Sequence, residues 1–272
     1  MSTDPPPPFQ LISSLRYDPI LPEVVSQQPA LAYPGPLRTP YYLLPYHLDR
    51  LTNAARHFCW HHALHLLDRD VATFLALLDG FIPDRTRPWR LRIVIEDKSE
   101  GGLTVEVNPT VPVEEPRLLV LPFTTTATAN SAQGVWRVYV DSQPTIPSAF
   151  TTHKTTAREY YTAARHRAGI RSPHELAEVL VVNPAGEVME GSITTPYFRR
   201  RSPDNGSSEW VTPPLSCGGN AGTTRRYALA QGFCSEQVIP AAGLVDGEEC
   251  WISNGVRGFM RGVVVLNRED SI

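Results

Sequence analysis

Glu187-Val-Met-Glu-Gly-Ser-Ile-Thr-Thr-Pro-Tyr-Phe198 is the part of this 272-residue sequence that says most about its fold. Its β-forming residues predict a strand over 187–198 that carries a carboxylate, Glu190. Glu187 competes with Glu190 for a functional role, but it ends Pro-Ala-Gly-Glu (184–187), which is typical of an exposed hairpin turn. We therefore predict that Glu190 is the functional carboxylate.

A lysine lies 36 positions before Glu190, a separation long enough for a helix and a return strand. This residue, Lys154, stands in Thr-Thr-His-Lys-Thr-Thr-Ala-Arg (151–158) and is one of two lysines in the chain. The other, Lys98, is flanked by charged residues at the end of a predicted strand, which is typical of a surface position. Burial and the neighbouring Arg158 are expected to lower the pKa of Lys154 and to make its amine nucleophilic. A solvated lysine at the start of a helix is the alternative interpretation.

A glycine-rich run lies downstream of the carboxylate. Gly218-Gly-Asn-Ala-Gly is followed by Thr-Thr-Arg-Arg (223–226), which predicts a loop that enters a helix near Gly222. The first amides of a helix have no partner within it, and the helix dipole favours an anion there. The run matches neither a Walker loop nor Gly-x-Gly-x-x-Gly. It is therefore either a phosphate site or a flexible loop before a threonine-capped helix.

Together these three elements are the groups that a protein needs to hold pyridoxal 5'-phosphate (PLP). An amine forms a Schiff base with the PLP aldehyde. A carboxylate keeps the ring nitrogen protonated, so that the ring can accept electrons. The start of a helix binds the phosphate. The sequence therefore predicts PLP as the cofactor, with Lys154 as its covalent partner and as the catalytic residue.

The same segments resemble those of the fold-type IV PLP enzymes, the group that contains branched-chain and D-amino-acid aminotransferases and 4-amino-4-deoxychorismate lyase. Residues 187–198 resemble the family's Glu-x-Ser/Gly segment, and Trp210-Val-Thr-Pro-Pro-Leu-Ser with Gly222-Thr-Thr-Arg resembles its phosphate cup. His47-Leu-Asp-Arg-Leu is similar to the His-x-x-Arg-Leu helix whose arginine also reaches the phosphate. Phe9-Gln-Leu-Ile-Ser-Ser-Leu-Arg-Tyr-Asp-Pro and Trp251-Ile-Ser-Asn-Gly-Val-Arg-Gly look most like the fungal lyases.

This resemblance implies a two-domain α+β fold like that of D-amino-acid aminotransferase. A smaller N-terminal α/β domain and a larger β-rich C-terminal domain are expected to meet at the cofactor. The residues that the resemblance assigns to the cofactor are Arg50, Lys154, Glu190, Thr223, Thr224, Ser253 and Asn254. Asn254-Gly255 departs from the threonine common in the aminotransferases, which leaves open whether a side chain or the backbone makes this contact.

The likeness to the lyases implies a substrate with two carboxylates, 4-amino-4-deoxychorismate. Arginine binds a carboxylate through two parallel hydrogen bonds. Arg16 on the first predicted strand and Arg257 before the last one are the candidates, and either could instead be a structural ion-pair partner. Tyr17 and Tyr160 are weaker candidates for contacts with the cofactor or substrate ring.

The expected reaction is the release of pyruvate to give 4-aminobenzoate for folate biosynthesis. A class IV aminotransferase, acting on a branched-chain amino acid, a D-amino acid or an amine, is the first alternative. A non-catalytic PLP-binding protein is the second. The resemblance also implies a homodimer.

Composition argues against several other classes. The net charge of −3 provides no basic field for nucleic acid. No apolar stretch reaches the roughly 20 residues that span a bilayer. The start of the sequence lacks the basic and apolar regions of a signal peptide, so we expect a cytoplasmic protein. His57, His61 and His65 have the spacing of helical metal ligands, but no HExxH arrangement accompanies them, and we predict a packing helix without a metal.

The expected organisation is a disordered proline-rich tail over 1–8, a small domain over 9–142, a linker over 143–152 and the PLP-binding domain over 153–272. Residues 21–40 predict a loop, and the sequence leaves open whether it acts as a lid. The helices are expected over 45–67, 69–79, 156–168 and 222–232. The strands are expected over 89–96, 103–107, 117–122, 135–140, 177–183, 187–198, 209–212, 235–239, 249–253 and 260–266, after a first one over 9–17.

Overall fold

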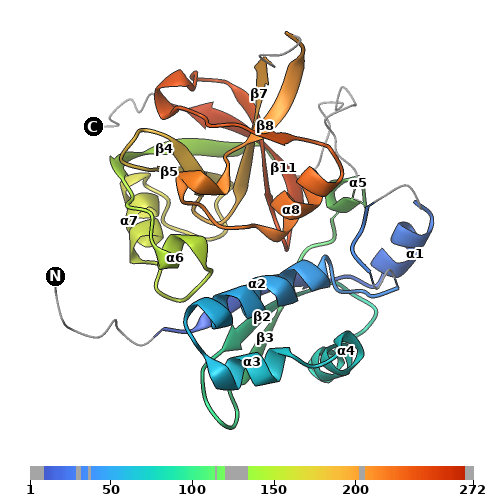
Figure 1. Ribbon diagram of the computed structural model, residues 1–272. Coiled ribbons are helices and arrows are strands. Elements are labelled where there is room, and N and C mark those ends of the chain that lie inside the picture. The colour runs from blue at the N-terminus through green and yellow to red at the C-terminus, as the bar shows by residue number, and fades with distance from the viewer. Residues whose placement is uncertain are drawn as a thin grey trace, which may run out of the picture.

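The computed structural model describes residues 9–28, 32–35, 38–113, 115–119, 134–201 and 206–266. They form a three-stranded sheet in the order β1-β2-β3 and an eight-stranded sheet in the order β6-β5-β4-β11-β10-β7-β8-β9. Figure 1 shows the small sheet and its helices below, in blue to teal, and the large sheet above. The predicted two-domain α+β architecture is thus confirmed. The tail predicted over 1–8 lies outside the described residues.

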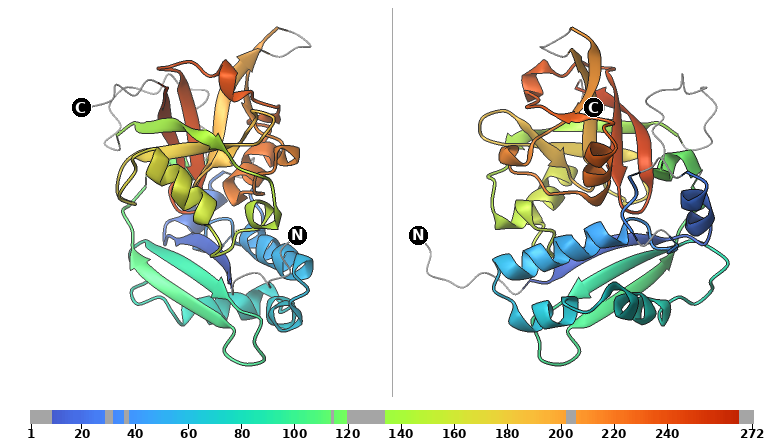
Figure 2. Two further views of the ribbon diagram at one scale, coloured as in Figure 1. Left: turned by 90° about the vertical axis from the view of Figure 1, so that its left-hand side faces the viewer. Right: turned by 45° about the vertical axis from the view of Figure 1, so that its right-hand side comes forward.

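The small sheet is antiparallel, and three helices cover one of its faces. Its strands are β1 (Leu11–Tyr17), β2 (Trp89–Ile95) and β3 (Leu103–Pro109). Its helices are α2 (Leu44–His57), α3 (His61–Leu67) and α4 (Val71–Asp79). Because side chains alternate along a strand, Leu91 and Ile93 pack on these helices while Arg90 and Arg92 lie on the opposite face. Helix α2 runs along the junction between the two halves in every view (Figures 1 and 2).

The large sheet combines parallel and antiparallel strands. Its strands are β4 (Trp136–Pro144), β5 (Ala177–Val182), β6 (Val188–Gly191), β7 (Thr195–Arg201), β8 (Ser208–Thr212), β9 (Ser235–Glu236), β10 (Glu249–Asn254) and β11 (Gly258–Val265). β4 runs parallel to both β5 and β11. Every residue of β5 is buried, because α7 (Glu159–Arg167) covers one side of the sheet and a second apolar cluster fills the other.

Shorter elements complete the large half. They are α6 (Ala149–Thr152), the 3₁₀ turns η1 (Leu215–Cys217) and η2 (Ala241–Gly243), and α8 (Thr223–Ala230). Helix α6 begins at Ser148, whose hydroxyl accepts the backbone N–H of Phe150. None of the helices in the described ranges is long and apolar enough to cross a membrane.

The strand predicted over 135–140 was assigned to the small domain, but it is a strand of the large sheet. As β4 it pairs with β5 and β11. The predicted linker over 143–152 contains the end of β4 and all of α6. The alternation of apolar residues predicts a strand, but it does not specify which sheet the strand joins, and this is why the assignment failed.

Two segments have a different secondary structure from the one predicted. Residues 21–26 form helix α1 (Leu21–Ser26) rather than a loop, and Leu21, Val24 and Val25 bury one face of it against the large half. A proline in its first turn was the overlooked signal. The strand expected over 117–122 is helix α5 (Glu115–Leu119) as far as the described residues extend. Its carbonyls accept hydrogen bonds from tyrosines of other segments, so tertiary contacts override the local β preference.

The helix predicted over 45–67 is interrupted at Cys59, which has a φ of 56°. The interruption lets Phe58 and Trp60 pack on Phe9, with ring centroids 4.7 and 5.2 Å away. A non-glycine residue with positive φ is uncommon, and here the aromatic contacts stabilise it. Among the described residues, no three His, Cys, Asp or Glu side chains gather as a metal-binding group.

Candidate active site

Lys154 lies where the large half of the chain returns to the first strand. Its backbone carbonyl accepts the N–H of Ile12 at 3.0 Å. The next residue, Thr155, bridges Leu11, and the N–H of Thr156 donates to the Gln10 carbonyl at 2.9 Å. Strand β1 therefore pairs with the small sheet on one edge and holds the lysine segment of the large half on the other.

The environment of Lys154 favours the neutral amine. Burial holds its pKa well below the usual value, and the positive charges of Arg158 and Arg50 lower it further. The nearby Glu190 opposes this shift. Because the pKa is lowered, the amine keeps its lone pair at a pH where a solvated lysine is protonated, which is the requirement for a nucleophilic or basic amine.

This lowered pKa predicts that Lys154 reacts with amine reagents at unusually low pH. Trace acetylation of the apoprotein at several pH values, read by mass spectrometry, measures the reactivity of each lysine, and the exposed Lys98 serves as the internal reference. We expect the reactivity of Lys154 to persist well below pH 10 and to disappear only as the pH falls through its lowered pKa. A profile for Lys154 that rises only near pH 10, the range of an ordinary lysine, would contradict this.

Glu190 on β6 is the carboxylate that faces this amine. The Tyr161 hydroxyl donates a hydrogen bond to Oε1, and the backbone N–H of Asn220 donates a second one. Burial raises the pKa of Glu190, and Tyr161, Lys154 and Arg158 oppose this shift. The carboxylate is thus a partly buried acceptor that makes two hydrogen bonds within the protein and has lone pairs left for a further donor.

The start of α8 meets a tight turn and a histidine. Gly222 precedes the helix without a capping side chain, and Thr223 and Thr224 in its first turn are buried. At Gly255, a Cβ would lie only 2.7–2.9 Å from the His47 ring and the Thr223 hydroxyl. Glycine is needed there because the turn approaches both groups so closely.

Two buried nitrogens on helix α2 have no hydrogen-bond partner among the described residues. They are Nε2 of His47 and Nε of Arg50. Both side chains are otherwise held by Ser13, whose hydroxyl lies 2.7 Å from His47 Nδ1 and accepts Arg50 Nη2 at 2.7 Å. Burial, with the nearby charges of Arg226 and Arg158, lowers the pKa of Arg50 to about 10, and Glu190 opposes this. Unsatisfied buried polar atoms are rare and indicate a missing partner.

Ser253 and Asn254 are occupied by contacts within the protein. The Ser253 hydroxyl donates to Thr224 Oγ1 at 2.7 Å and lies 2.8 Å from the Tyr197 hydroxyl. Asn254 Oδ1 accepts the backbone N–H groups of Val256 and Arg257 at 3.0 and 2.9 Å. The Asn254 side chain therefore shapes the turn at Gly255.

Arg16 and Arg257 have different surroundings. Arg16 is fully buried, pairs with Asp18 at 2.7 Å and also donates to the carbonyls of Val111 and Val256. Of the two roles that the sequence left open, these contacts fit the structural ion pair. Arg257 lies over the Trp136 ring at 5.4 Å and makes no ion pair with any described residue. Burial and the positive charge of Arg90 lower the pKa of Arg257.

The tyrosines that the sequence suggested lie elsewhere. The Tyr17 hydroxyl donates to the Arg85 carbonyl and the Tyr160 hydroxyl to the Phe150 carbonyl, while the next residue, Tyr161, contacts Glu190. The contact cannot be predicted from the sequence, because two adjacent tyrosines give no sign of which one faces the site. Ser13 left a clearer signal, since it is a polar residue on the apolar face of a strand.

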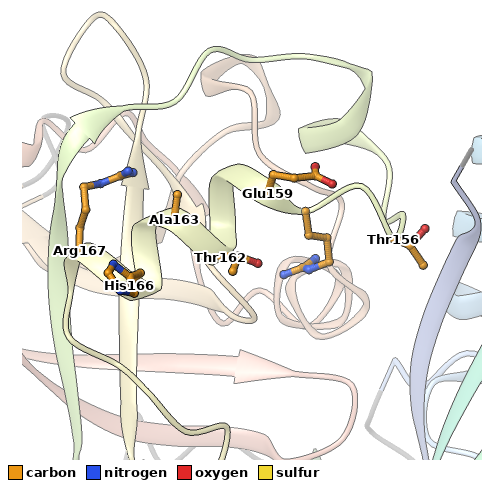
Figure 3. A pocket seen from close by; sticks show the side chains of 7 residues that line it. Thr156, Glu159, Thr162, Ala163, His166 and Arg167 are labelled. Atoms are coloured by element: carbon orange, nitrogen blue, oxygen red, sulfur yellow. The ribbon is translucent and has the colours of Figure 1, made fainter. Parts of the chain in front are cut away.

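A surface hollow of about 560 Å³ lies on the outer side of α7 (Figure 3). Its lining residues are Thr156, Arg158, Glu159, Thr162, Ala163, His166 and Arg167. Tyr161, on the inner side of the same helix, is buried and contacts Glu190. The hollow is therefore distinct from the interior where Lys154 and Glu190 meet, and only Arg158 contributes to both.

Comparison with known proteins agrees with this geometry. The family model described as "Amino-transferase class IV" matches residues 36–264, which is most of the chain. The chain belongs to the class IV aminotransferase family. Enzymes of this family depend on PLP.

Three known proteins are similar to this chain to different extents. The aminodeoxychorismate lyase of Saccharomyces cerevisiae is 39% identical over 139 residues, which is 47% of this chain and only 37% of the yeast protein. A provisionally assigned aminodeoxychorismate lyase of Schizosaccharomyces pombe is 25% identical over 237 residues, covering 85% of this chain and 87% of that protein. The structure of a provisionally assigned amino-acid aminotransferase of Mesorhizobium loti shares the fold, with a TM-score of 0.65, 23% identity, and coverage of 95% of this chain and 100% of that one.

The residues present fit the cofactor of the class IV family. Two arginines, Arg50 and Arg158, lie close to a single carboxylate, Glu190, so positive charge exceeds negative charge in the site even while Lys154 is neutral. A phosphate dianion would correct this imbalance. The unpaired nitrogens of His47 and Arg50 and the uncapped start of α8 are the donors that such a group requires.

Proposed function

We propose that this chain is a PLP-dependent 4-amino-4-deoxychorismate lyase, which releases pyruvate and forms the folate precursor 4-aminobenzoate. The similarity to the yeast lyase carries the choice of reaction. The meeting of Lys154, Glu190 and the start of α8 supports the choice of cofactor. We also propose, as the resemblance implies, a cytoplasmic homodimer, which sedimentation of the purified protein and cell fractionation would test.

Each part of the cofactor has residues that would hold it. When bound, PLP supplies an aldehyde that takes up an amine and a ring that accepts electrons. Lys154 would bind the aldehyde carbon through Nζ and, once released by the substrate amine, would accept and return a proton at Nζ. Glu190 would hold the proton of the ring nitrogen, and Tyr161 would fix the carboxylate for this role.

The phosphate would lie at the other end of the site. The backbone N–H groups of Thr223 and Thr224 would donate to it, because they belong to the uncapped first turn of α8. Arg50 would add a charged donor through Nε, which has no partner. Ser253 supports this turn through its bond to Thr224, and Asn254 does so by shaping the turn at Gly255.

Arg257 is our candidate for binding a substrate carboxylate. Its guanidinium makes no ion pair with a described residue, and the residue is only partly exposed. A partly desolvated arginine without a carboxylate partner binds a substrate carboxylate strongly, because the two groups then neutralise each other and form charge-assisted hydrogen bonds. Arg16 does not share this property because Asp18 already neutralises it.

The reaction is tested by following two signals in one cuvette. The protein is loaded with PLP, aminodeoxychorismate is added, and the absorbance of the cofactor and the fluorescence of 4-aminobenzoate are recorded together. A lyase accumulates 4-aminobenzoate over many turnovers while the yellow Schiff-base band persists. An aminotransferase, the alternative suggested by the family's name, bleaches the band until a keto acid restores it. A protein that never shows the band would refute the cofactor assignment.

Replacing Arg50 by methionine should weaken the binding of PLP. We expect its dissociation constant to rise roughly 10- to 100-fold, since a hydrogen bond to a charged group contributes about 1.5–3 kcal/mol. The apoprotein should lose little stability, because the nearby charges of Arg226 and Arg158 and the cost of desolvation oppose the attraction between Arg50 and Glu190. Titration of the apoprotein with PLP and thermal unfolding measure the two effects. Arg92→Met, which removes a cation paired with Glu106, is the matched control and should bind PLP normally.

A further inference from the structure

The turn that follows Glu190 is built around a carboxylate from the neighbouring strand. Residues 191–194 connect β6 to β7, and the Gly191 N–H donates to the Thr194 carbonyl at 2.9 Å. The side chain of Glu178 on β5 enters this turn and is fully buried. The conformation of the turn therefore depends on a carboxylate from another strand, β5.

Five hydrogen bonds hold the Glu178 carboxylate. Oε1 accepts the N–H of Val179 at 2.8 Å, the N–H of Ser192 at 3.0 Å and the Ser192 hydroxyl at 2.5 Å. Oε2 accepts the N–H of Ile193 at 3.1 Å and the Thr194 hydroxyl at 2.7 Å. A buried carboxylate is tolerated only when its oxygens are satisfied in this way.

Gly191 and Glu178 depend on each other. A Cβ at position 191 would lie 2.4 Å from the Thr194 hydroxyl and 3.0 Å from both Cγ and Cδ of Glu178. Any side chain there would push the carboxylate out of the turn. The glycine directly after Glu190 is thus required by a residue 13 positions earlier in the chain.

The same turn is connected to the lysine segment. The Ser192 carbonyl accepts a hydrogen bond from Arg158, and the Ser192 hydroxyl accepts one from Arg165 at 3.0 Å. Arg165 also lies 3.8 Å from the Glu178 carboxylate and offsets its charge. Arg158 in turn stacks on Tyr161, with 4.5 Å to the ring centroid, and Tyr161 donates to Glu190.

We propose that Glu178 is a positioning residue of the cofactor site: its carboxylate fixes the 191–194 turn and, through that turn, the places of Glu190 and Arg158. The inference rests on the proposed function in so far as Glu190 is the partner of the PLP ring nitrogen. Glu178 itself reaches neither the cofactor nor the substrate. It acts through the backbone that follows Glu190.

A neutral amide cannot take the place of this carboxylate. In Glu178→Gln the side chain keeps its shape, but it has one acceptor oxygen instead of two. Backbone N–H groups point at both oxygens of Glu178, at one from Val179 and Ser192 and at the other from Ile193. Whichever way the amide is turned, its NH₂ group meets a backbone donor, so the turn must move.

The test compares Glu178→Gln with the wild type in the apo and PLP-loaded forms. In the apoprotein we expect the amide of Ile193 to exchange with deuterium at least about 10-fold faster, because its acceptor is lost. The amide of Ser192 should change less, because it also donates to the Val179 carbonyl at 2.9 Å. The dissociation constant of PLP should rise about 10- to 100-fold, the range usual for residues that orient a ligand indirectly. The pH titration of the Schiff-base absorbance should also shift. Glu187→Gln, in the same hairpin but bonded to Asn183, is the control and should leave all three unchanged.

A folded Glu178→Gln protein with wild-type exchange at Ile193, or with wild-type PLP affinity and titration, overturns the proposal. If the variant does not fold, Thr194→Val removes one of the five bonds and should move the same signals in the same direction, by a smaller factor. Its agreement with the wild type would overturn the proposal equally. Failure of the proposed function is recognised separately, because the wild-type protein would then show no Schiff-base band with PLP, whereas exchange in the apoprotein would still test the hold of Glu178 on the turn.

Discussion

Lys154→Ala is expected to reduce the turnover of aminodeoxychorismate by at least about 10⁴-fold, since one group supplies both the covalent link and the proton transfer. The yellow Schiff-base band should be absent even at saturating PLP, because Lys98, paired with Glu96 at 2.5 Å on the surface, cannot replace it. Steady-state production of 4-aminobenzoate and the absorbance spectrum measure both effects.

The same variant separates loss of chemistry from loss of folding. The surroundings of Lys154 favour its neutral form, so its replacement removes an amine that is desolvated on folding and breaks no ion pair with a described residue. The apoprotein should therefore unfold at the same temperature as the wild type or above it. Lys98→Ala is the control and should retain full turnover. Turnover that survives in Lys154→Ala would support a protein that does not use PLP for catalysis.

Arg16→Met is expected to lower the free energy of unfolding by about 3–5 kcal/mol, the usual effect of leaving a buried charge without its partner. Asp18, whose side chain is 5% exposed, would remain in the interior, and the carbonyl of Val111 would lose its donors. Urea unfolding of the apoprotein measures the change. Arg261→Met removes a pair with Glu249 whose carboxylate is 72% exposed, and as the control it should change stability by no more than about 1 kcal/mol.

A second variant distinguishes the structural role of Arg16 from a substrate role. Adding Asp18→Asn to Arg16→Met removes the stranded charge, so part of the lost stability should return. A structural ion pair predicts this recovery together with a nearly normal KM in the folded enzyme. A raised KM for aminodeoxychorismate with unchanged stability would instead assign Arg16 to a substrate carboxylate.

The residues that define the candidate site could be found from the sequence because their chemistry is written in short segments. Lys154, Glu190 and the threonines of the α8 start each belong to a local pattern with a physical reason, and the structure places them around one interior. Their partners could not be found in this way. Tyr161 and Glu178 act through the pairing of β5 with β6 and through the packing of α7, which no local pattern specifies.

The positions of most helices and strands could be predicted from the sequence, but which strands pair with each other could not. Strands over 89–95 and 177–182 follow from alternating or continuous apolar residues. β4 belongs to the large sheet because it pairs with β5 and β11, and the alternation of apolar and polar residues along β4 does not predict its neighbouring strands. Helix α5 depends on tyrosine hydroxyls that arrive from Tyr42 and Tyr227, far away in the chain.

The anchoring of Lys154 to β1 has a mechanical consequence. Gln10 and Ile12 form backbone hydrogen bonds with Thr156 and Lys154, and strand β1 pairs with β2 along its whole length. If the two halves of the molecule move relative to each other, the backbone of Lys154 must move with the small half. In the proposed reaction, strand β1 therefore limits how far the backbone of Lys154 can shift when the substrate amine displaces its side chain.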